Sequence, residues 1–347
     1  MVDTAATSFR RTPQMPLKAS VAVSLGLAAL GALFATVAAA SDKPKPPTLA
    51  IALDGSAVPG GIAGVDGAET TIWFASAPRS AVGEVDVASR SISFIALGHG
   101  AKPRNLARCP NGKLYVLDPA LNVIHEVTPA TEEVKRHPMP SGTTADLSGA
   151  VCTTSNMLLF TGYNGWLGKL DTATAQVSLV EAVGGRGPAQ ITMAPSGSIW
   201  FAAYASNQIV RVDPQTLKQD AFMMPAGVEG PKDIAVDGSG RVWVSAFRSA
   251  RIARFDPRRR SWDAWPVGEG SRPHSIALDS NGDLLVTDVG RDRLLRFDPK
   301  TGSPTVVAQL SDRGQARSMI RLGDKAWISE SAADRLLGVD IAPGPSN

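Results

Sequence analysis

Residues 187–214 read GPAQITMAPSGSIWFAAYASNQIVRVDP, residues 230–257 read GPKDIAVDGSGRVWVSAFRSARIARFDP, and residues 272–299 read RPHSIALDSNGDLLVTDVGRDRLLRFDP. Each stretch alternates apolar and polar residues in short runs that are separated by Gly, Ser, Asn or Pro. This pattern is typical of β-strands joined by tight turns. The three stretches are copies of one repeat that begins with Pro and ends with Asp-Pro.

The repeat extends over most of the chain. One large apolar position recurs with steps of 42, 44, 41, 43, 42 and 42 residues, at Trp73, Tyr115, Leu159, Trp200, Trp243, Leu285 and Trp327. Seven copies of this length, each with four short strands, are typical of a β-propeller. The prediction is an all-β fold: a seven-bladed β-propeller of four-stranded antiparallel blades, with the marker residues packed between blades.

The seventh repeat is too short to hold its outer strand. Only residues 342–347 follow the strand expected at 336–341, whereas residues 48–53 form an apolar run with no repeat of their own. We expect this N-terminal strand to complete the last blade and close the ring, because closure removes free sheet edges. The predicted propeller spans residues 48–342, and residues 343–347 form a tail.

The first forty residues have the pattern of a signal peptide. Arg10, Arg11 and Lys18 precede an uncharged apolar run, Val21–Ala40, that ends in three alanines. The pattern predicts cleavage after Ala40, a linker at 41–47, and a periplasmic or secreted protein. An uncleaved anchor is the alternative, and it would be the only membrane contact.

Charge and cysteine content exclude some classes. The formal net charge is +3, of which residues 1–40 carry +2, so the predicted propeller lacks the basic excess of a nucleic-acid binder. Cys109 and Cys152 fall one column apart in neighbouring repeats. Because side chains alternate along a strand, we expect them to point in different directions and to remain two buried thiols without a disulfide.

Two columns of the repeat should meet at one mouth of the channel, because the first strand of each blade starts where the second strand ends. The first column holds Gly60, Arg104, Ser148, Ala189, Lys232, His274 and Ser318. The second column holds Ser76, Asp118, Gly162, Ala203, Ala246, Asp288 and Glu330. The symmetric spacing predicts that His274 lies opposite Asp288, and Arg104 opposite Asp118.

Polar groups that converge in a concavity are candidates for a site. Tyr204 follows the second column and is expected to form part of the rim. A structural interpretation stays open for each residue. Arg104 and Asp118 would be a cross-strand ion pair, Asp288 would bind loop amides, and His274 would be a solvated residue at the mouth.

The repeat resembles the streptogramin (virginiamycin) B lyases and, more loosely, other NHL-type propellers. The shared pattern is G-P-x-x-I-x-x-x-x-x-G-x-x-W-F, then I-x-R-x-D, then an outer strand that ends in Pro, as at His137–Pro140, Phe222–Pro225 and Trp265–Pro266. The resemblance implies a seven-bladed propeller that opens a cyclic ester by Mg²⁺-assisted elimination. It covers all seven repeats and is clearest over 187–299.

The resemblance also implies site residues. His274 matches the family's catalytic histidine, and Asp288 and Glu330 match its carboxylate position as catalytic groups and candidate metal ligands. The family has a metal-linked Glu where this sequence has Arg272, and a guanidinium does not bind Mg²⁺. Arg104, Lys232, Arg272, Asp118 and Tyr204 are the candidate substrate-binding residues.

Three functions stay open. The first is an exported lyase-like enzyme with His274 as general base or acid. The second is a non-catalytic propeller of the cell envelope that binds a ligand or a protein. The third is a gluconolactonase-like hydrolase, for which the inner strands supply Asn105 and Asp233 but no complete metal set. In each case a small-molecule or peptide-like ligand is expected at one mouth of a monomer.

Overall fold

The computed structural model describes residues 49–52, 59–63, 70–333 and 335–341. The predicted signal peptide 1–40, linker 41–47 and tail 343–347 lie outside the described residues. The described ranges form 28 strands and no helix. No helix long and apolar enough to cross a membrane therefore occurs in them.

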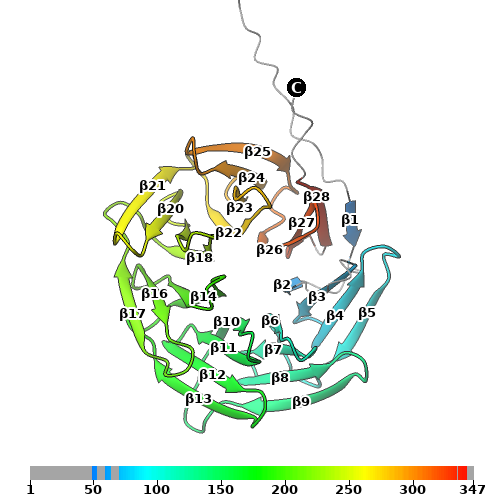
Figure 1. Ribbon diagram of the computed structural model, residues 1–347. Coiled ribbons are helices and arrows are strands. Elements are labelled where there is room, and N and C mark those ends of the chain that lie inside the picture. The colour runs from blue at the N-terminus through cyan, green and yellow to red at the C-terminus, as the bar shows by residue number, and fades with distance from the viewer. Residues whose placement is uncertain (1–48, 53–58, 64–69, 334, 342–347) are drawn as a thin grey trace, which may run out of the picture. The chain divides into compact units, whose positions relative to one another are not determined.

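Seven four-stranded antiparallel sheets form a ring around a central channel (Figure 1), so the predicted seven-bladed propeller is confirmed. The strands of the first four blades are β2 (Pro59–Ala63), β3 (Thr71–Ser76), β4 (Ala81–Asp86) and β5 (Ile92–Ala96); β6 (Asn105–Arg108), β7 (Leu114–Asp118), β8 (Val123–Thr128) and β9 (Glu133–Pro138); β10 (Leu147–Cys152), β11 (Met157–Gly162), β12 (Trp166–Asp171) and β13 (Gln176–Glu181); β14 (Pro188–Met193), β15 (Ile199–Ala203), β16 (Gln208–Val212) and β17 (Gln219–Met223).

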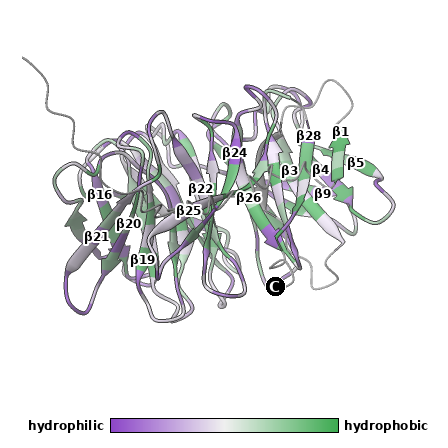
Figure 2. Cartoon of the chain, turned by 90° about the horizontal axis from the view of Figure 1, so that it is seen from above, coloured by the Kyte–Doolittle hydropathy of each residue, from purple (hydrophilic) through white to green (hydrophobic). Residues whose placement is uncertain are grey.

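The remaining blades follow the same order from the channel outward. Their strands are β18 (Pro231–Val236), β19 (Val242–Ala246), β20 (Arg251–Asp256) and β21 (Ser261–Pro266); β22 (Pro273–Leu278), β23 (Leu284–Asp288), β24 (Arg293–Asp298) and β25 (Ser303–Gln309); β26 (Ala316–Leu322), β27 (Lys325–Glu330), β28 (Arg335–Asp340) and β1 (Leu49–Ala52). Seen from the side in Figure 2, the strands run between the two faces of the ring, and much of the hydrophilic colour lies in the connections.

The N-terminal strand closes the ring, as predicted. Strand β1 pairs antiparallel with β28, from Leu49 opposite Gly338 to Ala52 opposite Arg335. Ile51 is 4% exposed and packs in one cluster with Phe74 and Leu336. Because Phe74 belongs to blade 1, β1 stabilises the boundary between the last blade and the first.

The core lies between neighbouring blades. The marker residues Trp243, Trp327 and Tyr115 are among the largest fully buried side chains. Trp200 of blade 4 contacts Phe255 of blade 5 across one such boundary, with ring centroids 6.3 Å apart, and Phe222 of its own blade at 5.7 Å. The marker column is therefore core, as the sequence predicts.

A β-bulge recurs where the innermost strand of each blade begins. The register between first and second strand shifts at this point in six hairpins. In blade 2, Arg104 N donates to Leu117 O (2.9 Å) although Asn105 is the register partner of Leu117. A bulge inserts one extra residue and re-aims its side chain. The first sequence column lies at this bulge in blades 1 to 6, whereas in blade 7 the extra residue is Arg317 rather than Ser318.

Cys109 and Cys152 form a disulfide, with Cα atoms 5.2 Å apart, so the expectation of two free thiols is wrong. The offset of one column does place the two side chains on opposite faces of their own blades. Neighbouring blades, however, meet through opposite faces: the cysteines lie in one cluster between blades 2 and 3, beside Ala107 and Ala150. An offset of one column therefore brings them together.

Candidate functional site

The bulged residues bring their side chains to one cavity at a mouth of the channel. Arg104, Ser148, Ala189, Lys232 and His274 line it, each from the innermost strand of a different blade. In blade 7 the bulged residue is Arg317, because Ala316 pairs with Glu330 and Ser318 with Ser329. Both Arg317 and Ser318 line the cavity, but Arg317 occupies the position equivalent to His274.

The cavity is large and its described lining is cationic. Its volume is about 1010 Å³, and its charged lining residues are Lys102, Arg104, Lys232, Arg317 and a single carboxylate, Asp146. Arg104 Nη1 donates to Asp146 Oδ1 at 2.7 Å and to the carbonyl of Leu147 at 3.1 Å. The single carboxylate therefore offsets one of the four cations.

His274 is the one titratable group of the lining with a pKa near neutrality in water. Its ring stands edge-on to Phe247, with centroids 5.9 Å apart, and its Nδ1 is buried with no hydrogen-bond partner among the described residues. Burial, followed by the charges of Lys232 and Arg317, lowers the pKa of His274 to about 3. The imidazole is therefore neutral at pH 7, with an unpaired nitrogen.

Lys232 shares this environment. Its ammonium lies 5.5 Å from the centroid of the Tyr204 ring. Burial, and then the charge of Arg317, lowers the pKa of Lys232 from its ordinary value. Tyr204 stands beside the cavity rather than in its lining, as does Arg272, whose guanidinium lies 5.9 Å from the Phe247 ring centroid. Aromatic rings thus alternate with cations over blades 4 to 6.

The carboxylates Asp288 and Glu330 do not reach the cavity. Both are fully buried, and the structure contradicts the expected pairing of His274 with Asp288, because Asp288 pairs with Pro273. Asp288 accepts hydrogen bonds from the amides of Arg272 (2.7 Å) and Gly290 (3.2 Å) and from Arg293 Nε (3.0 Å). The bulge displaces His274 by one residue and points it toward the axis.

Glu330 has an equivalent role in the next blade. Its carboxylate accepts hydrogen bonds from the amide of Ser311 (2.7 Å), from the hydroxyl of Ser311 and from Arg335 Nε (2.7 Å). These donors fix the loop that enters blade 7. Both carboxylates therefore hold loops in place and have no oxygen directed at the cavity.

Asp118 is the third buried carboxylate of this series, and its predicted pairing with Arg104 is wrong. It accepts from His125 Nε2 (3.0 Å) and from the amides of Lys102, Ala120 and Leu121. Burial alone would raise the pKa of Asp118, but the hydrogen bonds from His125 and the amides lower it overall. Arg104 pairs with Asp146 of the next blade instead.

The residues at this mouth do not fit a divalent metal ion. Magnesium binds oxygen ligands with free lone pairs, whereas Asp288 and Glu330 lie in separate blades and are occupied by arginine and amide donors. Asp233 is bound to Ser275 Oγ and the amide of Ile276, both at 2.9 Å. Within the described ranges no group of three His, Cys, Asp or Glu side chains has the spacing of a metal site.

The lining residues that sequence reasoning missed include Lys102, Asp146, Gln190 and Arg317. Arg317 directly precedes Ser318 of the first column, and a tabulation of cations near that column would have found it. Gln190 lies one residue deeper than Ala189, where its Oε1 accepts from Asn105 Nδ2 at 3.2 Å. Nothing in the sequence pattern indicates that this second layer reaches the channel.

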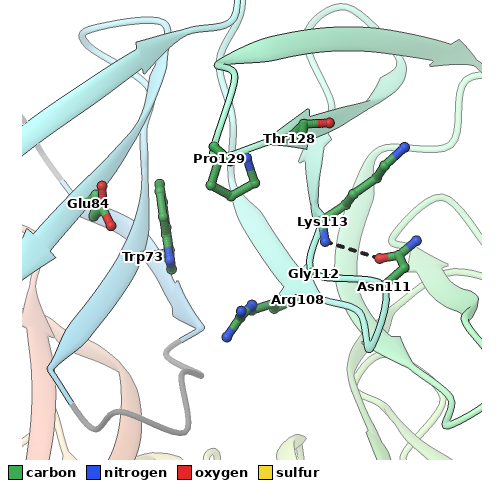
Figure 3. A pocket seen from close by; sticks show the side chains of 9 residues that line it. Trp73, Glu84, Arg108, Asn111, Gly112, Lys113, Thr128 and Pro129 are labelled. Atoms are coloured by element: carbon green, nitrogen blue, oxygen red, sulfur yellow. Dashed lines mark hydrogen bonds between the residues drawn. The ribbon is translucent and has the colours of Figure 1, made fainter.

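The turns on the opposite face form smaller hollows. Figure 3 shows one of about 380 Å³ between blades 1 and 2, where Trp73 and Pro129 flank a space beside Arg108. Asn111 accepts there from the amide of Lys113 at 3.1 Å. Lys113 itself is paired with Glu126. This hollow lacks the convergent cations of the axial cavity, which is the candidate site.

Comparisons with known proteins agree with this architecture. The family model described as the virginiamycin B lyase family matches residues 49–254, and an NHL repeat model matches residues 271–297. No curated protein sequence matches the chain.

Solved structures share the fold at low sequence identity. A streptogramin B lyase structure is 18% identical, with a TM-score of 0.76 over 84% of this chain and 96% of that one. A catalytically inactive histidine-to-alanine variant of virginiamycin B lyase from Staphylococcus aureus, with quinupristin, is also 18% identical, with a TM-score of 0.76 over 84% and 98%. The extracellular domain of a one-component system from B. thetaiotaomicron is 14% identical, with a TM-score of 0.67 over 87% and 44%.

Proposed function

The chain belongs to the virginiamycin B lyase family, and from this premise we propose that it is a lyase-like enzyme that acts by elimination on an ester or related substrate in the axial cavity. The observation that carries the proposal is His274. Its imidazole is neutral, its Nδ1 has no partner among the described residues, and it faces a cavity lined by cations. A solved relative loses catalysis when one histidine is replaced by alanine.

The proposed chemistry needs a base and stabilisation of negative charge. His274 removes a proton from the carbon next to a carbonyl group, and the electron pair of that C–H bond forms a C=C bond. The C–O bond to the leaving carboxylate or alkoxide breaks, and the leaving group takes its electron pair. Lys232, Arg104 and Arg317 stabilise the negative charge that develops on the carbonyl oxygen.

No step of this proposal passes through a metal ion. In the lyases that the repeat resembles, Mg²⁺ assists the elimination. Here the carboxylates Asp288 and Glu330 already accept hydrogen bonds from Arg293 and Arg335. Arg104, Lys232 and Arg317 place positive charge around the same cavity. The protein is therefore proposed to act without Mg²⁺.

Binding without catalysis is the second candidate, and the low pKa of His274 favours it. A base with a pKa of about 3 is weak, and proton abstraction requires that the bound substrate raise this value. If no bound group does so, the cavity is a ligand site on an envelope propeller. The two candidates differ in whether product forms.

We also propose export from the cytoplasm. Disulfides form and persist in oxidising compartments, and Cys109 and Cys152 are joined across two blades. The basic and apolar pattern of residues 1–40 supports the same location.

Incubation of the purified protein with quinupristin, followed by liquid chromatography and mass spectrometry, tests the elimination. We expect a product of unchanged mass and shifted retention, formed equally with Mg²⁺ and with EDTA. His274→Gln should lower its rate at least about 100-fold, while the matched control His99→Gln, at an exposed histidine, should leave it unchanged. A mass gain of one water would show hydrolysis instead. An unchanged substrate would reject this antibiotic and make ligand binding the leading function.

A further inference from the structure

We infer that the natural ligand of the axial cavity is a small organic anion that carries at least one carboxylate. The inference rests on the site assigned under the proposed function, but not on its elimination step. It concerns what the cavity binds, and its test measures binding rather than product.

Most of the cations that line the cavity have no carboxylate partner among the described residues. Asp146 is the single carboxylate among the described lining residues, and it is paired with Arg104. No carboxylate of the described ranges forms an ion pair with Lys232 or Arg317; the Arg317 guanidinium donates to the neutral side chain of Gln315 at 3.0 Å. Lys232 is partly buried, and a cation removed from water is normally paired. An anion bound in the cavity supplies the carboxylate partner that Lys232 and Arg317 lack.

The cations reach this cavity from different blades. Arg104, Lys232 and Arg317 occupy the bulged positions of blades 2, 5 and 7, and each is aimed into the same cavity. The depressed pKa of Lys232, caused by burial and then by Arg317, agrees with mutual repulsion. A ligand that places one anionic group among these cations relieves their repulsion, whereas a divalent cation would increase the repulsion.

The size of the cavity and its neutral lining residues also favour an organic acid. A volume of about 1010 Å³ is at the upper end of the range for small-molecule sites, so the cavity suits a small molecule. Arginine guanidinium groups match the planar fork of a carboxylate. Asn105, Gln190 and Tyr163 add amide and aromatic groups to the lining, which suits an organic acid better than a bare inorganic anion.

The unpaired Nδ1 of His274 gives the inference a spectroscopic readout. A carboxylate placed between Lys232 and Arg317 brings a negative charge beside both of the cations that help to hold the pKa of His274 low. Binding is therefore expected to raise the pH at which His274 titrates. Because burial remains the larger cause of the low pKa, the expected change is a partial rise.

The test uses tricarballylate as the anionic probe and its trimethyl ester as the uncharged control. Isothermal titration at constant ionic strength measures binding, and NMR of the imidazole ring of His274 measures its titration. We expect the acid to bind and the ester not to bind. Lys232→Gln and Arg317→Gln should each weaken binding at least about 10-fold, Lys232→Arg should restore it in part, and Lys300→Gln, at an exposed lysine on the opposite face, should have no effect.

The outcomes separate this inference from the proposed function. Equal binding of acid and ester, no binding of the acid, or undiminished binding by the Lys232→Gln/Arg317→Gln double variant would overturn the inference. Circular dichroism of each variant verifies that it is folded. Anion binding without elimination of any ester would support the inference and reject the lyase function. Elimination of quinupristin by a protein that does not bind tricarballylate would support the lyase function and reject the inference.

Discussion

At the scale of single residues, the occupancy of an oxygen decides whether a carboxylate can take part in a site. Asp288 and Glu330 lie at the correct end of their strands, and sequence spacing alone places them near His274. Their oxygens already accept from arginines and loop amides. His274 differs because its Nδ1 has no partner among the described residues. Spacing could locate these residues along the channel, but it contains no information about which lone pairs remain free.

The Glu330 carboxylate is predicted to contribute to stability rather than to metal binding. Glu330→Gln leaves Arg335 without its anion and weakens two bonds to Ser311. Loss of one partner of a buried ion pair costs about 3–5 kcal/mol, and the partial exposure of Arg335 places the expected loss at the lower end. Urea unfolding measures it. Addition of Mg²⁺ should shift the midpoint of neither protein, and a shift confined to the wild type would instead indicate a metal ligand.

The low pKa of His274 predicts a stability loss in acid. The pKa of His274 is about 3 in the folded protein and 6.5 in a model peptide. The unfolded chain therefore binds the proton first as the pH falls. Stability attributable to neutral His274 is complete above about pH 6.5 and declines from there toward pH 3. The free energy of unfolding falls by at most about 1.4 kcal/mol per pH unit. The actual fall is smaller because the His274 ring is partly exposed.

Comparison of wild type with His274→Gln isolates this dependence, because all other titrating groups are shared. Lys232 and Arg317 are the charged groups that, after burial, lower the pKa of His274, so Lys232→Gln should raise that pKa and end the stability loss at a higher pH. Parallel stability curves for wild type and His274→Gln between pH 7 and pH 4 would show that His274 titrates normally.

At the scale of strands and blades, the repeat period predicts the hairpins correctly, but not the bulge within them. Trp200 and Trp243 identify their strands because burial between blades demands a large apolar side chain at a fixed place. The bulge adds a residue without changing the repeat length, so it leaves no trace in the spacing. It moves His274 out of register with Asp288 and brings Arg317 into the lining. The directions of the His274 and Arg317 side chains could therefore be established only from the structure.

The disulfide is predicted to hold blades 2 and 3 together. The cross-link closes a segment with a sequence separation of 43, and removal of such a cross-link typically costs about 2–4 kcal/mol. The Cys109→Ser/Cys152→Ser variant should unfold at lower denaturant concentration than the oxidised wild type. Dithiothreitol should lower the wild type to the level of the variant and leave the variant unchanged. A wild type that does not respond to the reductant would contradict the cross-link.

At the scale of the whole molecule, the ring depends on one short strand. The missing outer strand of the seventh repeat could be predicted from the sequence because only six residues follow Ile341. The identity of its substitute could also be predicted, because residues 48–53 form an apolar run beside the first repeat with no repeat of their own. The register, with Ile51 opposite Leu336, follows from the need to bury one face of β1.

Neighbouring positions on β1 offer a matched test of closure. Ile51 is buried and Ala50 is exposed, so aspartate at position 51 places a charge in an apolar cluster, whereas aspartate at position 50 faces solvent. Ile51→Asp should lower the free energy of unfolding by about 3 kcal/mol or more and yield oligomers through the uncovered edge of β28. Ala50→Asp should remain monomeric. Size-exclusion chromatography and thermal unfolding measure both effects, and equal behaviour of the two variants would contradict closure through β1.

The pairing of β1 with β28 also imposes an order in time. Strand β1 ends at Ala52 and its partner begins at Arg335, so the ribosome synthesises nearly the whole chain between them. At about 5–20 residues per second, this interval lasts roughly 15–60 s. Blades formed from contiguous hairpins can assemble during that interval, but the ring stays an open arc with two unsatisfied ends. The ring can therefore close only after β28 has been synthesised.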